Sequence, residues 1–110
     1  MLCPIHEDTP GPGTPVFENG AVRFAATGDP ADVPAGRLTL RVIREELAAI
    51  VAQRAADDPH LAYLDGRELY GDADAEELPL PDALHPDAAT HLRMGERFAD
   101  LAFGGSLPGW

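Results

Sequence analysis

The sequence has 110 residues, and its 19 acidic against 8 basic residues give a formal net charge of −11 at pH 7. This length fits one small domain, and the acidic balance argues against nucleic acid and anionic membrane surfaces as partners. The hydrophobic fraction of 45% is too high for a disordered acidic tail, and no apolar run approaches the roughly 18 residues of a membrane span.

The N-terminal segment, Met1–Ile5, is short and apolar and is stopped by Pro4. It predicts the end of a β-strand. The segment lacks the basic and apolar regions of a signal peptide, so a cytoplasmic location is expected. Cys3 is the only cysteine, which excludes an internal disulfide and a cysteine-based zinc site.

Residues 9–36 are rich in Pro and Gly and predict a loop, because Pro removes backbone donors and Gly favours turns. Within this loop, Val16–Glu18 and Ala21–Phe24 flank the pair Asn19 and Gly20. An Asn-Gly pair is typical of a two-residue hairpin turn. A lone hairpin is marginally stable, so we expect it to lie against the main body.

The next segment, residues 38–56, predicts a helix with one apolar stripe. Residues 61–64 predict a short buried strand that is closed by a turn at Asp65 and Gly66. The stripe consists of Leu40, Ile43, Leu47, Ile50 and Val51.

The C-terminal part begins with one helical turn at residues 67–70 and an acidic surface loop at residues 71–77. A final helix is expected over residues 86–103, with Pro86 in its first position and Asp87 near the positive end of its dipole. Its expected inner face consists of Ala88, Leu92, Gly95, Phe98, Ala99 and Ala102.

This order of elements predicts an α/β fold. Two strands joined through a helix form one right-handed crossover unit of a parallel sheet. Two strands are few for such a sheet, which needs neighbouring strands and a helix layer on each face. The chain is therefore expected to form only a part of an α/β domain.

The most informative chemistry lies between Leu80 and Asp87. Asp82 and His85 are three residues apart in a Pro-bounded turn before a helix. A carboxylate at this spacing can fix the tautomer of an imidazole and stabilise its protonated form, as in a Ser-His-Asp triad. The alternative is purely structural, with Asp82 capping a turn and His85 capping a helix.

The block Asp-x-x-His-Pro before a final helix resembles the last motif of the SGNH (GDSL-type) ester hydrolases. Further segments resemble one bacterial branch of that family in the same order, so the resemblance covers nearly the whole chain. The segments are Cys3–Asp8, Pro10–Pro12, Leu40–Arg44, Tyr63–Gly71 and His91–Phe98.

The resemblance implies the C-terminal portion of a flavodoxin-like three-layer α/β/α sandwich. It also implies a hydrolase acting on a small-molecule ester, with Asp82 as the orienting acid and His85 as the general base. The family's serine and oxyanion-hole blocks are missing and would lie upstream of Met1. Ser106, the only serine, follows the histidine and does not match the nucleophile. The chain alone is therefore expected to be inactive.

Other candidate sites are weaker. Cys3 is a remote thiol nucleophile for His85, although a small buried side chain is the simpler interpretation. The run His6–Asp8 and the pair His85 and His91 lack metal-ligand spacing, and the acidic run 72–77 lacks a calcium-loop pattern. Residues 11–13 carry no phosphate-loop lysine. We expect neither metal nor cofactor.

Two classes of function remain open. The first is a hydrolase portion, as a truncated product, a gene-model fragment or one half of a split enzyme that an N-terminal half completes. The second is a small acidic interaction domain without catalysis. An exposed sheet edge would allow self-association in either case.

Overall fold

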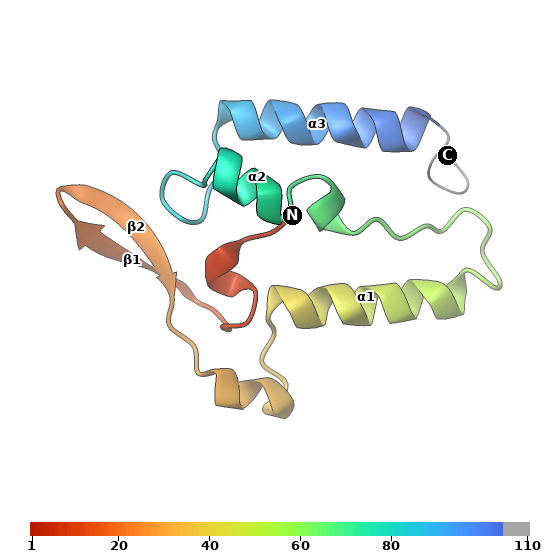
Figure 1. Cartoon of the computed structure of the whole chain (residues 1–110). Coiled ribbons are helices and arrows are strands. Elements are labelled where there is room, and N and C mark those ends of the chain that lie inside the picture. The colour runs from red at the N-terminus through yellow and green to blue at the C-terminus, as the bar shows by residue number, and fades with distance from the viewer. Residues whose placement is uncertain (105–110) are drawn as a thin grey trace.

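The computed structural model describes residues 1–104 of the chain. Figure 1 shows a hairpin projecting from one end and two long helices, α1 and α3, on opposite sides of the connecting chain. The elements in chain order are a 3₁₀ helix at Pro4–His6, β1 (Gly13–Glu18), β2 (Ala21–Ala26), a 3₁₀ helix at Pro30–Ala35, α1 (Leu40–Arg54), a 3₁₀ helix at Gly66–Glu68, α2 (Asp72–Glu77) and α3 (Ala88–Phe103).

The predicted hairpin is confirmed. Strands β1 and β2 pair antiparallel up to Glu18 and Ala21, and Asn19 and Gly20 both have positive φ, at 49° and 77°. Positive φ at both central positions is what this turn type requires. The hairpin contacts the body through its second strand, where the Phe24 N–H donates to the Asp82 carbonyl at 2.7 Å.

The predicted parallel sheet is wrong. Among residues 1–104 the only sheet is the two-stranded antiparallel hairpin, so no three-layer α/β/α sandwich forms. Residues 61–64 run without regular structure, and the N-terminal segment forms a 3₁₀ helix instead of a strand end. A strand needs a neighbour that accepts and donates a series of backbone hydrogen bonds. Within residues 1–104 the N-terminal segment makes one such bond, from the Leu2 N–H to the Tyr70 carbonyl at 2.8 Å, and residues 62–64 make none.

The two long helices lie where the periodicity predicted them. Thr39 caps α1 by accepting from the Val42 N–H, and Asp87 caps α3 by accepting from the Thr90 N–H at 2.9 Å. Asp87 is thus the N-cap, and Pro86 precedes the helix instead of occupying its first position. Within residues 1–104, no helix is both long and apolar enough to cross a bilayer.

Helix α2 replaces the acidic loop expected at residues 71–77. Its Asp74 is buried and accepts from the Gly71 N–H at 2.9 Å, from Arg93 at 3.0 Å and from Arg97 at 2.6 Å. Both arginines belong to α3, where four-residue spacing puts them on one face. The acidic segment is therefore the ionic partner of α3.

These ion pairs also set which face of α3 turns inward. Of the expected inner face, Ala102 is buried and Phe98 half-buried, but Leu92 is 64% exposed. Met94 is the partly buried residue that packs against the core instead. Because Arg93 and Arg97 face Asp74, α3 does not adopt the orientation that would bury every residue of its expected apolar face.

The core is small, and the shape is open. Leu2, Cys3, Tyr70 and Leu80 form the buried cluster. The radius of gyration is 16.2 Å, whereas a compact chain of this length would have about 13 Å. The extents of 50 × 37 × 17 Å describe a flat plate, little thicker than one helix of about 10–12 Å.

We expect Asp74→Asn to lower the free energy of unfolding by about 2 kcal/mol at pH 6. The Arg97 guanidinium, and to a smaller extent Arg93, hold the pKa of Asp74 at about 2, below the ordinary 3.8. A depressed pKa stabilises the fold fully above about pH 4 and loses its effect as the pH falls toward 2. Urea unfolding followed by circular dichroism at pH 6, 4 and 3 measures the difference.

The gap between wild type and Asp74→Asn should therefore shrink steadily below pH 4. Glu76→Gln, an exposed change on the same helix, serves as the matched control and should stay within about 0.5 kcal/mol. A difference in stability that remains constant from pH 6 to pH 3 would contradict the view that ionised Asp74 stabilises the fold.

Candidate functional site

The Asp-x-x-His segment forms a tight turn between α2 and α3. The Ala83 N–H donates to the Leu80 carbonyl at 3.0 Å, and Ala83 itself has a positive φ of 69°. One carboxylate oxygen of Asp82, Oδ1, accepts from the backbone N–H groups of Leu84 at 2.9 Å and His85 at 2.7 Å. Asp82 thus holds the turn with Oδ1, which leaves Oδ2 available for a side-chain contact.

The free oxygen meets the imidazole. Asp82 Oδ2 lies 2.6 Å from His85 Nδ1, and the His85 side chain is 66% exposed. The ring of Phe24 on β2 meets the imidazole edge-on, with centroids 5.4 Å apart and planes at 81°. Sequence reasoning missed Phe24, because only the hairpin's position brings it to the turn.

The electrostatics of the pair are asymmetric. The backbone N–H of His85, and next its side chain, lower the pKa of Asp82 to about 2. An ionised carboxylate only accepts hydrogen bonds, so Nδ1 carries the shared proton and donates it. The other ring nitrogen, Nε2, is then the basic one. This arrangement can take a proton from a hydroxyl group that lies in the ring plane within hydrogen-bond distance of Nε2.

No described residue supplies the nucleophile. Ser106 lies outside the described residues. The Cys3 thiol is buried and directed at the Ala83 carbonyl, with 3.7 Å between Sγ and the oxygen. Burial raises its pKa above the ordinary 9.0, which keeps the thiol protonated and unreactive. The structure therefore gives no support to a Cys3-based mechanism.

The remaining candidates also occupy structural positions. Glu7 and Asp8 pair with arginines of α1, and His91 is an exposed residue of α3. In residues 1–104, no three or more side chains of His, Cys, Asp or Glu gather in a way that could hold a metal ion.

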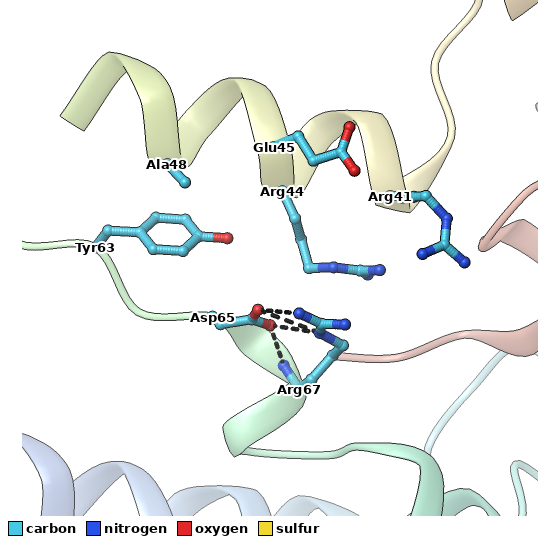
Figure 2. A pocket seen from close by; sticks show the side chains of 7 residues that line it. All are labelled: Arg41, Arg44, Glu45, Ala48, Tyr63, Asp65 and Arg67. Atoms are coloured by element: carbon cyan, nitrogen blue, oxygen red, sulfur yellow. Dashed lines mark hydrogen bonds and ion pairs between the residues drawn. The ribbon is translucent and has the colours of Figure 1, made fainter. Parts of the chain in front are cut away.

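A second polar region, not expected from the sequence, lies between α1 and residues 63–67. Figure 2 shows Arg44 and Tyr63 beside the Asp65–Arg67 pair in a pocket of about 180 Å³. The three arginines around it are Arg41, Arg44 and Arg67. Three guanidinium groups close together form a candidate anion-binding site, and they stand out in a chain whose net charge is −11.

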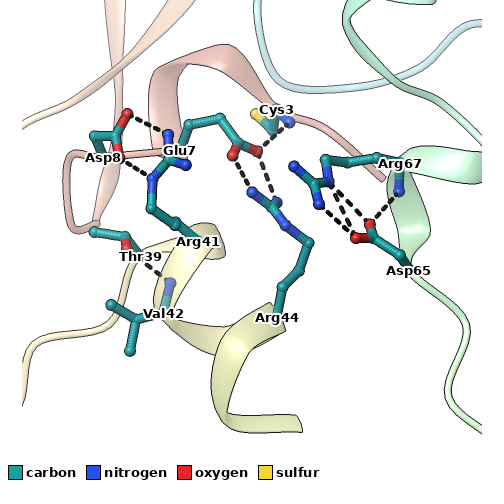
Figure 3. Close-up of polar contacts among 9 residues, drawn as sticks. All are labelled: Cys3, Glu7, Asp8, Thr39, Arg41, Val42, Arg44, Asp65 and Arg67. Carbon is teal, nitrogen blue, oxygen red and sulfur yellow. Dashed lines mark hydrogen bonds and ion pairs between the residues drawn. The ribbon is translucent and has the colours of Figure 1, made fainter. Parts of the chain in front are cut away.

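Each of these guanidinium groups already has a carboxylate partner (Figure 3). Arg41 binds Asp8, with Nε 2.6 Å from Oδ1, and Arg67 binds Asp65, with Nη2 2.7 Å from Oδ2. Arg44 donates to both oxygens of Glu7, and both side chains are only 13% exposed. The cluster therefore fastens α1 to the N-terminal segment and leaves no net positive charge for an anion.

Comparisons of the chain with protein-family models, with curated proteins and with solved structures gave no match.

Proposed function

We propose that Asp82 and His85 are the orienting acid and the general base of an ester hydrolase whose serine nucleophile comes from another polypeptide segment. The single observation that supports this is the 2.6 Å contact between Asp82 Oδ2 and His85 Nδ1, made at an exposed imidazole. A merely structural cap has no need for the second carboxylate oxygen, because Oδ1 alone already holds the turn.

In the proposed reaction, His85 Nε2 removes the serine proton as the serine oxygen attacks the ester carbonyl. The resulting imidazolium is stabilised by the Asp82 carboxylate. Nε2 then protonates the departing alcohol, which leaves an acyl-serine. In the second half, Nε2 takes a proton from water as the water oxygen attacks the acyl carbonyl, and it then returns this proton to the serine oxygen as the carboxylic acid leaves.

The resemblance to the SGNH ester hydrolases supports the class of substrate, a small-molecule ester, and assigns this chain to the C-terminal portion of such an enzyme. In that family a serine block and oxyanion donors come from the N-terminal half. We therefore expect this chain to work only together with such a half, in the cytoplasm, and to hydrolyse no ester at an enzymatic rate alone.

Complementation tests the proposal. The full chain is mixed with a separately expressed N-terminal half of an SGNH hydrolase that carries the serine block, and release of nitrophenol from p-nitrophenyl acetate is followed. We expect hydrolysis above the sum of the two separate halves. No gain on mixing would argue against the proposed role, as would a gain unchanged when the added half lacks its serine.

The open shape favours a second candidate, a non-catalytic interaction domain. Several large apolar side chains are exposed in the described residues, among them Phe17 at 78% and Leu38 at 58%. Such side chains mark contact surfaces when they cluster. A monodisperse chain that binds partners equally well with and without His85 would support this alternative.

A further inference from the structure

Residues 62–64 form an extended segment with unused backbone hydrogen-bonding groups. Within the described part of the chain, no hydrogen bond involves the N–H or C=O of Ala62, Tyr63 or Leu64. All three residues are nevertheless half-buried. Unpaired N–H and C=O groups on an extended segment offer an edge to which another strand can pair.

The neighbouring elements limit where a partner can approach. Residues 61–69 run between α1 and α3 (Figure 1). Tyr63 lines the pocket on α1 (Figure 2), and Arg97 of α3 donates to the Leu69 carbonyl at 3.1 Å. Side chains of an extended segment alternate between two sides, and its N–H and C=O groups point at right angles to them. A strand that pairs with this segment would therefore approach it from a direction that α1 and α3 leave open.

The partner must offer backbone hydrogen bonds and apolar side chains. Unpaired N–H and C=O groups of an extended segment are best matched by another extended segment. Leu47 and Ile50 on α1 remain 48% and 50% exposed, so α1 also leaves apolar surface uncovered. A plate only 17 Å thick also lacks the second layer that domains normally need around a core.

We propose that residues 62–64 are a docking edge for one extended, apolar and non-acidic segment of a different polypeptide, added by β-strand pairing. The net charge of −11 disfavours a second copy, because two copies would repel each other. This docking edge does not depend on the chemistry of Asp82 and His85.

The test uses the full chain and a displayed library of random twelve-residue peptides. We expect enrichment of peptides with alternating apolar residues and few acidic ones. Ala62→Pro removes one unpaired backbone donor without removing any hydrogen bond of the fold, and should weaken binding of an enriched peptide at least tenfold. Fluorescence anisotropy measures the affinity, and circular dichroism verifies that the variant folds.

Two further measurements complete the test. N-methylation of alternate peptide amides should also weaken binding at least tenfold, because it removes donors while keeping the side chains. Leu92→Ser, at an exposed apolar position on α3, is the control and should leave affinity unchanged. The proposal is overturned by no enrichment, by equal binding to Ala62→Pro, or by dimerisation of the chain alone that Ala62→Pro abolishes.

Discussion

His85→Ala should reduce ester hydrolysis by the complemented enzyme by roughly 10⁵-fold. Without the imidazole, the serine in the first half of the reaction and the water in the second half have no acceptor for their protons, so both halves lose general-base catalysis. Residual activity should reflect only binding and oxyanion stabilisation. The rate of nitrophenol release at saturating p-nitrophenyl acetate measures the loss.

The chain supplies a matched control in His91, an exposed histidine on α3. His91→Ala removes the same side chain and should leave the rate within twofold. Asp82→Asn should cost about 10⁴-fold, because an amide does not hold the tautomer that leaves Nε2 basic. Retention of more than a tenth of the activity in His85→Ala would exclude the general-base role.

The pH dependence gives a further readout for Asp82. Its pKa of about 2 keeps the carboxylate ionised at every pH above about 3. The loss caused by Asp82→Asn should therefore be equally large at pH 6 and pH 9. A loss of activity seen at only one of these two pH values would contradict the prediction that Asp82 is ionised throughout this range.

Local elements were predictable because local chemistry determines them. The stripe containing Ile43 and Leu47 predicted α1, and the pair Asn19 and Gly20 predicted the hairpin turn. Both depend on interactions within a few residues. The strand expected at residues 61–64 depends on a neighbouring strand, and no described residue of this chain provides one.

Long-range ion pairs were the other source of error. The acidic run containing Asp74 predicts a solvated loop, whereas the structure has a short helix in which only Asp74 is buried, paired with Arg93 and Arg97. The two arginines at four-residue spacing were visible, but nothing in the sequence specified which carboxylate they would meet. The Asp82–His85 contact could be predicted from the sequence, because the two residues lie three positions apart in one turn.

The small core makes Tyr70 the most sensitive residue for stability. Its side chain is fully buried beside Leu2 and Leu80, its hydroxyl donates to the Leu78 carbonyl at 2.7 Å, and burial raises the pKa of its phenol. Tyr70→Ala should cost about 4 kcal/mol through the lost apolar contact and the cavity left behind. Small domains are stable by only about 5–15 kcal/mol, so this one change removes a large part of the stability.

We therefore expect Tyr70→Ala to lower the free energy of unfolding by about 4 kcal/mol, as measured by urea unfolding followed by circular dichroism at 25 °C. Tyr70→Phe keeps the ring and removes only the hydroxyl, and should cost about 1–2 kcal/mol. Phe17→Ala removes an aromatic ring that is 78% exposed on the hairpin, and should stay within about 0.5 kcal/mol. Equal losses in Tyr70→Ala and Phe17→Ala would mean that the cluster around Tyr70 does not hold the plate together, and that stability resides in the ion pairs of α1 and α3 instead.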